Sequence, residues 1–377
     1  MATIGILGGG QLARMLALAG APLGHRFLVV DSAEDPCAAQ VAPLLRADWR
    51  DFATLEGFAR QVDVATFDFE NVPAETAEWL TEHTRVFPNP LALATAQDRF
   101  AEKSLFRAIG LGTPAFAAVD SQDDLRAAVS TIGFPGVLKT RRLGYDGKGQ
   151  CVLREEADIE RAWRALGGVP LILEAFVPFE REVSVIAVRS REGEFRHYPL
   201  TRNWHRHGIL SASLAPLTDA VELERRAVIH ARALAERLDY VGVFALELFV
   251  RDGELLANEM APRVHNSGHW TIEGTACSQF ENHVRAVLGQ PLGDTSARGC
   301  SVMLNWIGEL PDPAAVLVES GGHWHDYGKS ARAGRKVGHA TICADDAKDL
   351  AASLTRIGEA LGRQADVAPV IAALDAR

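Results

Sequence analysis

The segment LKTRRLGYDGKGQ, residues 138–150, combines positive charges with closely spaced glycines. Lys139 stands at the end of an apolar run, and three glycines, interleaved with charged and aromatic residues, follow it. Glycine lets a backbone approach anionic oxygens closely, and a lysine supplies a compact positive charge. The segment therefore predicts a loop that covers a polyphosphate, although a solvated hairpin fits its composition equally well.

A second group of candidate residues is acidic. Glu247 in FALELF and Glu259 in ANEM flank a turn signal at Asp252-Gly253, and Asn258 accompanies them. Carboxylates together with phosphate oxygens are the usual ligands of Mg²⁺ in proteins. A plain two-residue turn would place Glu247 opposite Asn258, whereas a three-residue loop or a bulge would place it opposite Glu259. We predict that the two glutamates pair, because the flanking apolar residues then fall on common faces.

A glycine motif lies close to the N-terminus. Gly8, Gly10 and Ala13 form G-x-G-x-x-A after an apolar strand, and the next apolar run ends at Asp31. This pattern is typical of dinucleotide-binding units, in which the N-terminus of the helix attracts a phosphate. The same glycines would also serve simply to pack a strand against a helix, so the motif alone does not identify a ligand.

The segment EAFVPFEREV places three glutamates around a predicted strand, a turn and the next strand. This arrangement is typical either of a hinge that presents a carboxylate to a ribose or of a solvated charged turn. The three residues are Glu174, Glu180 and Glu182.

Two further motifs resemble known sites but fail on spacing. In GGHWHDYGKS, one residue too many separates Gly322 from Gly328 for a P-loop, and no long helix is predicted after Ser330. Two H-x-H pairs have no C-x-x-C or H-E-x-x-H companion, so we expect no zinc site. These pairs are His205/His207 and His323/His325.

Composition limits the class of protein. The chain has 377 residues, which suffices for two or three domains, and no apolar run long enough to span a bilayer. Its net charge of −10 argues against broad nucleic-acid binding, and its five cysteines form no C-x-x-C pair. The sequence enters a strand at once, without a secretory signal. We therefore expect a cytoplasmic protein that binds neither nucleic acid nor membrane.

Hydrophobic periodicity predicts the elements that position these residues. Residues 1–90 alternate strands (4–7, 27–31, 62–69) with helices (from 11, 52–60, after 73), as in a parallel α/β unit. One helix is predicted over 91–109, followed by a linker at 110–114. The middle region has strands at 115–119, 136–140, 150–153 and 171–176, helices at 123–132 and 157–166, the antiparallel strands REVSVIAVRS and EFRHYPLTRN, and a helix at 223–238. An amphipathic helix with Leu350, Leu354, Ile357 and Leu361 closes the chain.

Taken in order, a series of segments resembles the ATP-grasp ligases, and more narrowly the family of 5-(carboxyamino)imidazole ribonucleotide synthetases (PurK) of purine biosynthesis. The segments are GGGQLARM, TFDFENVP, QDRFAEK, LKTRRLGYDGKGQ, EREVSV, NWHRHGI, FALELF, ANEMAPRVHNSGHWT and GRKVGH. GYDGKGQ and PRVHNSGHWT are the most specific. The resemblance implies a multidomain α/β and α+β protein with an ATP-grasp fold: a Rossmann-like parallel-sheet domain (1–95), an ATP-grasp domain (96–290, with a lid at about 112–177) and a small C-terminal domain (291–377).

The same resemblance implies the ligands and their residues. ATP and Mg²⁺ would bind between the middle domain and the hairpin, while the glycine loop would border the acceptor ribonucleotide, so no NAD is expected. The ATP contacts would be Arg99, Lys139, Gly144, Tyr145, Asp146, Gly147, Lys148, Gly149, Gln150, Glu174, Ala175, Phe176, Val177, Glu182, His205, Asn258 and Glu259, with Lys103 nearby. The Mg²⁺ ligands would be Glu247 and Glu259. The acceptor contacts would be Gln11, Leu12, Glu70, Lys329, Arg335 and Lys336, and the catalytic group Tyr145, Asp146, Lys148, Arg263 and His265.

The implied reaction is the ATP-dependent carboxylation of 5-aminoimidazole ribonucleotide by bicarbonate through carboxyphosphate, carried out by a homodimer. Asp146 is the candidate base for the amine proton. One departure concerns Asp68, because the family often has Glu-x-Glu where this chain has Asp68-x-Glu70; Asp68 is left without a role. The alternatives are a formate-dependent glycinamide ribonucleotide transformylase of the same superfamily, a dehydrogenase, and a nucleotide-binding regulator without activity.

Overall fold

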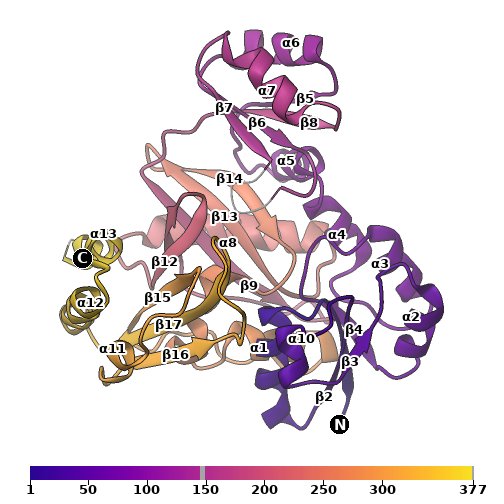
Figure 1. Ribbon diagram of the computed structural model, residues 1–377, viewed down its shortest axis with the longest axis vertical. Coiled ribbons are helices and arrows are strands. Elements are labelled where there is room, and N and C mark those ends of the chain that lie inside the picture. The colour runs from indigo at the N-terminus through magenta and orange to yellow at the C-terminus, as the bar shows by residue number, and fades with distance from the viewer. Residues whose placement is uncertain (145–148, 376–377) are drawn as a thin grey trace.

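The computed structural model describes residues 1–144 and 149–375, and within these ranges the chain forms three sheets with flanking helices (Figure 1). The N-terminal sheet is parallel, with strand order β3-β2-β1-β4. Its apolar strands are buried between helices, as the sequence predicted. Its elements are β1 (Thr3–Leu7), α1 (Gln11–Gly20), η1 (Ala21–Leu23), β2 (Arg26–Asp31), η2 (Cys37–Gln40), β3 (Leu44–Arg46), α2 (Phe52–Ala59), β4 (Val64–Phe67) and α3 (Ala74–Thr81).

The single helix predicted over 91–109 is wrong. The structure has two helices there, α4 (Pro90–Ala96) and α5 (Arg99–Ala108). Asp98 leaves the helical conformation, and its carboxylate accepts hydrogen bonds from the backbone N–H groups of Phe100 and Ala101. An aspartate that caps a new helix in this way ends the previous one, although the apolar periodicity continues across the break.

A small antiparallel sheet, order β5-β8-β6-β7, forms the lid lobe that stands apart at the top of Figure 1. Two helices pack on it around a core that includes Leu138, Leu173 and Ile159. The elements are β5 (Phe116–Val119), α6 (Gln122–Ile132), β6 (Gly136–Thr140), β7 (Gln150–Leu153), α7 (Asp158–Leu166) and β8 (Leu171–Ala175), close to the predicted ranges.

The largest sheet has nine strands and runs without interruption from the middle of the chain into its C-terminal part, because β12 pairs with β15. The predicted strand EFRHYPLTRN is in fact two strands. Pro199 lies between them, and proline cannot donate to a sheet ladder. The strands are β9 (Arg181–Arg189), β10 (Phe195–His197), β11 (Thr201–Arg206), β12 (Ile209–Ala215), β13 (Gly242–Arg251), β14 (Glu254–Ala261), β15 (Cys300–Ile307), β16 (Gly322–Asp326) and β17 (Lys336–Ala344).

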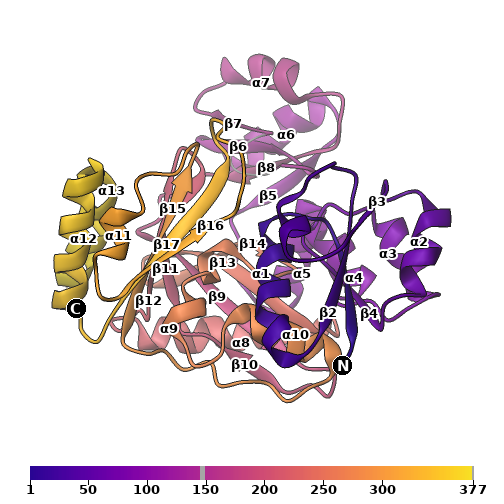
Figure 2. The same cartoon turned by 60° about the horizontal axis from the view of Figure 1, so that its bottom comes forward.

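Helices cover this sheet at several places. In Figure 2, α1 and α10 lie between the N-terminal sheet and the large sheet. The helix predicted to close the chain, α12, is amphipathic as expected, with Leu350, Leu354 and Ile357 buried and Leu361 packed beside them. It is not the last helix, however, because α13 follows it. The helices are α8 (Val221–Arg237), η3 (Asn266–Gly268), α9 (Thr271–Gly274), α10 (Gln279–Leu288), α11 (Ala314–Leu317), α12 (Ala347–Leu361) and α13 (Gln364–Asp375).

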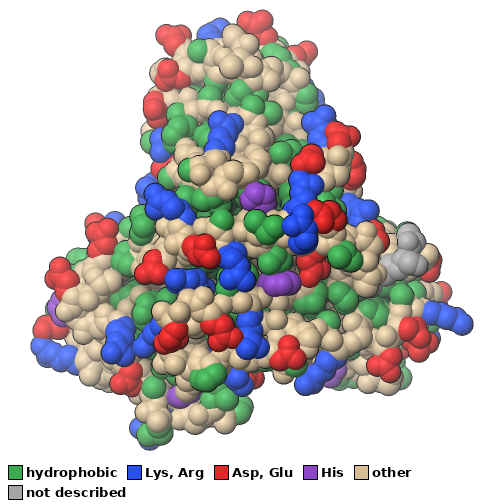
Figure 3. All heavy atoms as spheres, turned by 180° about the vertical axis from the view of Figure 1, so that it is seen from behind, with side chains coloured by type: hydrophobic (Ala, Val, Ile, Leu, Met, Phe, Trp, Pro, Cys, Tyr) green, Lys and Arg blue, Asp and Glu red, His purple; other side chains and the backbone are tan. Residues whose placement is uncertain are grey.

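The surface carries charges of both signs. On the face opposite that of Figure 1, basic and acidic side chains are interspersed across both the lid lobe and the body (Figure 3). Among the described residues, no helix is both long and apolar enough to cross a membrane.

Candidate active site

A cavity of about 390 Å³ lies between the lid sheet, the start of α5 and the β13–β14 hairpin. Its wall combines residues that are far apart in the sequence. The predicted residues that line it are Arg99, Lys139, Gly144, Gln150, Glu174, Ala175, Phe176, Val177, Glu182, His205, Glu247, Asn258, Glu259, Arg263 and His265, together with Glu70 and Lys336 from the acceptor set. Tyr145, Asp146, Gly147 and Lys148 lie outside the described residues.

The hairpin presents two carboxylates side by side. Its turn is the two-residue Asp252-Gly253, both with positive φ, as a tight hairpin turn requires. A bulge after Glu247 inserts Asn258 as an extra residue in β14 and brings Glu247 opposite Glu259. The predicted pairing of the two glutamates is therefore confirmed, and the device that produces it is the bulge.

Two lysines meet one glutamate where the lid adjoins α5. Glu174 Oε2 lies 2.9 Å from Lys139 Nζ and 3.3 Å from Lys103 Nζ. Burial raises the pKa of Glu174, but the two lysines outweigh burial and hold the pKa below its usual value. Within the described part of the chain, Glu174 Oε1 is buried without a hydrogen-bond partner. The cluster therefore places Lys139 and an unused acceptor at one wall of the cavity, with Lys103 fully buried beside them.

Arg99 connects the hairpin to Gly144, where the glycine-rich segment of residues 144–149 begins. Its guanidinium donates to Glu259 Oε2 at 2.8 Å and to the carbonyl oxygen of Gly144 at 3.2 Å. Desolvation opposes ionisation of Glu259, but Arg99 overcomes it and lowers the pKa of Glu259 to about 2. Gly149, at the other end of the loop, has a φ of +70°, and a Cβ there would lie 2.7 Å from Thr140 Oγ1. Glycine is therefore required at this position.

Two features of this region were missed by sequence reasoning. Glu102 is fully buried and accepts the backbone N–H of Met260 at 2.6 Å; burial, reinforced by Glu259, raises the pKa of Glu102 to about 8. Asp98 forms a two-point ion pair with Arg141, at 3.0 and 2.7 Å. An aspartate directly before an apolar-periodic segment is a helix-start signal that could have revealed Asp98, whereas nothing in the sequence marks Glu102 as buried.

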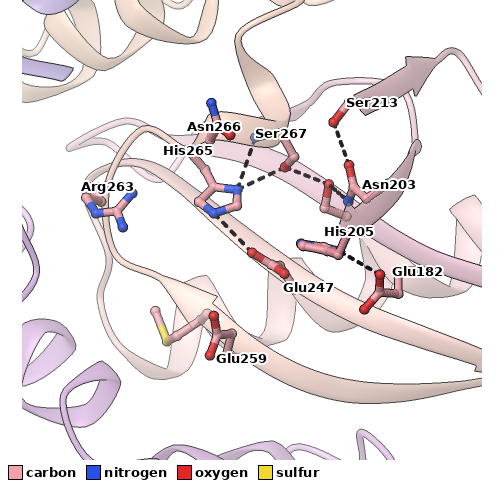
Figure 4. A network of polar contacts seen from close by, with 12 residues as sticks. Glu182, Asn203, His205, Ser213, Glu247, Glu259, Arg263, His265, Asn266 and Ser267 are labelled. Carbon is pink, nitrogen blue, oxygen red and sulfur yellow. Dashed lines mark hydrogen bonds and ion pairs between the residues drawn. The ribbon is translucent and has the colours of Figure 1, made fainter. Parts of the chain in front are cut away.

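Two histidines face the carboxylates of the large sheet, as Figure 4 shows. His205 Nδ1 lies 2.5 Å from Glu182 Oε2, and His265 Nε2 lies 3.0 Å from Glu247 Oε1. Burial alone would lower the pKa of His205, but its hydrogen bond to Glu182 raises it above the ordinary value. Arg263 lies beyond His265 and pairs with Glu70.

The N-terminal glycine motif is arranged differently. The N–H of Gly9 donates to Asp31 Oδ2 at 2.7 Å, and the N–H groups of Gly10 and Ala13 donate to Asp68 at 2.7 and 2.8 Å. A Cβ on Gly10 would lie 2.4 Å from Asp68 Oδ2. The helix N-terminus is thus capped from within the protein, and Asp68, which the sequence left without a role, performs the capping.

The remaining acceptor residues lie around this loop and do not line the cavity. Lys329 donates to Gln11 Oε1, joining positions 318 residues apart, and burial lowers the pKa of Lys329. Leu12 is buried in α1, and Arg335 bonds to Ser330. Glu70, two residues after Asp68, pairs with Arg263, and both residues line the cavity, so that the loop region and the cavity adjoin.

Family models match most of the chain in three parts. Residues 1–97 match the ribonucleotide synthetase preATP-grasp domain, 104–280 the ATP-grasp domain, and 301–353 the phosphoribosylaminoimidazole carboxylase C-terminal domain. The order of the three matches is the order of domains that the sequence segments implied.

Relatives match along nearly their whole length. The chain is 56% identical over 345 residues to an N5-carboxyaminoimidazole ribonucleotide synthase of Pseudomonas aeruginosa, covering 91% of this chain and 95% of the relative. It is similar to the crystal structure of the synthetase from Thermus thermophilus, with a TM-score of 0.91, 52% identity and coverage of 94% and 98%. An Aspergillus clavatus synthase in complex with ADP and 5-aminoimidazole ribonucleotide superposes with a TM-score of 0.89 at 28% identity, covering 96% and 99%.

Proposed function

The chain belongs to the N5-carboxyaminoimidazole ribonucleotide synthase family of ATP-grasp ligases, and on this premise we propose how its residues divide the work of the reaction. It is an ATP-dependent enzyme of purine biosynthesis that carboxylates 5-aminoimidazole ribonucleotide. The observation that carries the assignment of roles is the cavity itself, which has Lys139, paired with Glu174, at one wall and the carboxylates of Glu247 and Glu259 at another.

ATP occupies the cavity under the lid. Lys139 and Arg99 contact its phosphates, because both are held at the cavity wall by carboxylates that a bound nucleotide would displace. Glu174 Oε1 accepts a hydrogen bond from a hydroxyl or an amino group of the nucleoside, since this buried oxygen has no partner among the described residues. The apolar segment at 175–177 covers the base.

Mg²⁺ is held by Glu247 and Glu259 together with phosphate oxygens. The residues described in the structure contain no group of three or more side chains that would hold a metal ion by themselves. Two carboxylates plus substrate phosphates are a usual donor set for Mg²⁺, so the residues fit the ion only when the nucleotide is present. The bound ion supplies neutralisation of charge around the transferred γ-phosphoryl group.

The chemistry begins at bicarbonate, which is a poor electrophile. An oxygen of bicarbonate attacks the γ-phosphorus of ATP, the bond to the β-phosphate oxygen breaks, and carboxyphosphate and ADP form. Carboxyphosphate then separates into CO₂ and phosphate, and the exocyclic amine attacks CO₂ and loses a proton. Arg263 and His265 line this pocket. Asp146, close in sequence to Tyr145 and Lys148 in the glycine-rich segment of residues 144–150, is the proposed base.

The acceptor ribonucleotide lies between the glycine loop and Glu70. Gln11 and Lys329 are already joined there, and Lys329 with Arg335 and Lys336 forms a positive group suited to the 5′-phosphate. Glu70 faces the ribose. We further propose a homodimer that works in the cytoplasm, where the five cysteines would remain reduced.

The test is release of ADP from Mg-ATP and bicarbonate, with and without 5-aminoimidazole ribonucleotide, repeated with formate and glycinamide ribonucleotide. ADP release that requires the aminoimidazole compound supports the proposal. Release only with formate would move the activity to the transformylase, and no release in either case would favour a regulator. A Glu247→Gln, Glu259→Gln double variant, purified identically, controls for contaminating ATPases.

A further inference from the structure

A buried chain of polar side chains extends behind His265, away from the cavity (Figure 4). Ser213 Oγ lies 2.8 Å from Asn203 Oδ1, and Asn203 Nδ2 lies 3.0 Å from Ser184 Oγ. Ser184 Oγ is 2.8 Å from Ser267 Oγ, which is 2.9 Å from His265 Nδ1. Four hydrogen bonds therefore connect the imidazole to β12, on the far side of β9 and β11.

The chain is built into the large sheet. Asn203 on β11 and Ser213 on β12 are register partners, Ser184 lies on the neighbouring β9, and Ser267 belongs to η3, which packs on these strands. These four residues are at most 5% exposed. Burying polar groups is unfavourable unless each is paired, and here each of these side chains is hydrogen-bonded to the next.

The hydrogen bonds have one direction. The backbone N–H of Ser267 points at His265 Nδ1, at 3.4 Å, and an amide N–H only donates. Nδ1 is therefore an acceptor, and the Ser267 hydroxyl donates to it as well. Ser267 Oγ then accepts from Ser184, Ser184 accepts from the amide of Asn203, and Asn203 Oδ1 accepts from Ser213.

The geometry points to His265 as a hydrogen-bond donor whose tautomer and ring orientation are set by Ser267, Ser184 and Asn203, which act as positioning residues. With Nδ1 accepting, the ring proton is on Nε2, 3.0 Å from Glu247 Oε1 at the cavity wall. His265 then orients the carboxylate and leaves its second oxygen for a cation. In this arrangement His265 is not the base that removes the amine proton. The consequence for catalysis rests on the proposed function, whereas the tautomer of His265 rests on the hydrogen-bond geometry alone.

The tautomer is measurable without any reaction. Nitrogen-15 NMR of the imidazole rings, with His265 assigned by comparison with His265→Gln, should show the Nε2–H form in the ligand-free enzyme at pH 8. In Asn203→Asp, which has nearly the same size, the new carboxylate accepts from both Ser213 and Ser184. Ser184 then no longer donates to Ser267, and the Ser267 hydroxyl can turn from Nδ1 toward Ser184. The share of the Nε2–H form in the His265 signal should therefore fall, although the backbone N–H of Ser267 still points at Nδ1. A wild-type ring with its proton on Nδ1 would overturn the inference, even in an enzyme that carboxylates normally.

Kinetics separate positioning from general support of the fold. We expect Ser184→Ala and Ser267→Ala to lower kcat by about tenfold to a hundredfold, as outer partners of active-site ligands commonly do, with little change in KM for ATP. Ser301→Ala removes a hydroxyl that is equally buried on β15, outside the chain, and serves as the matched control. If Asn203→Asp fails to fold, Ser213→Ala tests the same end of the chain with a smaller change.

The decisive experiment compares the effect of Ser184→Ala in the wild-type enzyme with its effect in the His265→Gln enzyme. His265→Gln keeps an N–H near the position of Nε2 but has no tautomers, so it should retain more activity than His265→Ala. Ser184→Ala added to His265→Gln should then cause no further loss of kcat, because the chain acts through the imidazole. An equal loss in both backgrounds would show a merely structural role. If the wild-type enzyme lacks carboxylation activity, the proposed function fails while the NMR result still decides the geometry.

Discussion

The glycine loop after β1 and the cavity under the lid both combine glycines with charged residues, yet their positive groups are used differently. In the loop, three backbone N–H groups are bonded to Asp31 and Asp68 from the same sheet. In the cavity, Lys139 and Arg99 pair with carboxylates that line an open space. A backbone amide cannot turn to a new partner, whereas a lysine or arginine side chain can.

This difference explains why a glycine motif alone is a poor guide to ligand binding. Glycines permit a close approach of the backbone, but a phosphate also needs donors that are free or can be exchanged. The donors of the loop are consumed by carboxylates that hold α1 in place. The donors of the cavity are side chains, and their present partners are the residues proposed to share the nucleotide and the metal ion.

The largest effect is expected from removing an exchangeable donor. Lys139→Met should lower kcat/KM for ATP by about a hundredfold to a thousandfold, the usual loss when one preorganised donor to a reacting group is removed. Titration with ADP should show weaker binding, while the unfolding temperature changes little because Lys103 still pairs with Glu174. Lys348→Met, at an exposed lysine on α12, is the matched control. Unchanged ADP affinity would remove Lys139 from the nucleotide site.

The contact between the N-terminal sheet, which carries the glycine loop, and the large sheet, which carries the hairpin of the cavity, should be sensitive to acid. His283 on α10 accepts from the N–H of Val243 on β13 and contacts Thr66 on β4 at 2.8 Å, and burial lowers its pKa to about 4. In the unfolded chain, the His283 imidazole binds a proton from about pH 6.5 downward, whereas in the folded protein it does so only near pH 4. The contribution of neutral His283 to the free energy of unfolding is therefore complete above about pH 6.5 and is lost as the pH falls toward 4. The lost stability from this group is about 3 kcal/mol.

Urea unfolding at pH 7.5 and 5.0 measures this loss. His269 and His339 are also fully buried, and burial lowers their pKa values, so they contribute in the same direction. His283→Gln should reduce the difference in stability between the two pH values. An identical difference in the variant would show that His283 does not carry the acid sensitivity.

A smaller effect is expected at the glycine loop. Asp68→Asn replaces an acceptor of two backbone N–H groups by a side chain with one acceptor atom, so one buried N–H loses its partner. We expect a loss of about 1–3 kcal/mol in the free energy of unfolding, with KM for ATP unchanged. A fall in ATP affinity comparable to that of Lys139→Met would erase the distinction between the two regions.

The sequence was most informative where local pattern and chemistry coincide. Apolar alternation predicted the parallel sheet and the lid strands, and the apolar faces beside Glu247 and Glu259 predicted their pairing. It failed where a single side chain overrides periodicity, as Asp98 does when it ends α4 and caps α5.

The sequence did not reveal contacts between residues that are far apart in the chain. Asp68 stands 58 residues from Gly10, and Ser184 stands 83 residues from Ser267. Such contacts follow from how sheets and helices pack and leave no signal in local spacing. For the same reason, Asp31 completes a dinucleotide-type pattern by its spacing, although its carboxylate accepts the N–H of Gly9.

The smallest effect tests the cavity from its buried side. Because burial, with Glu259, raises the pKa of Glu102 to about 8, its carboxyl group is protonated at pH 7. Glu102→Gln keeps the size and the acceptor for Met260 and should change kcat/KM by less than about threefold at pH 7. Glu259→Gln, which removes a charge that Arg99 stabilises, should be far more damaging.

The pH profile of ATP binding makes this last difference sharper. Above pH 8 the wild-type Glu102 loses its proton and places a second negative charge near Glu259, so ATP affinity should decline between pH 7.5 and 9. The Glu102→Gln enzyme has no such group and should keep its affinity over that range. If both enzymes decline equally, the alkaline loss comes from another group, and Glu102 is ionised already at neutral pH. Its buried charge would then have to be balanced by Lys103 and Arg99. Arg99, which is assigned to the nucleotide, would in that case be committed inside the protein, as the amides of the glycine loop are.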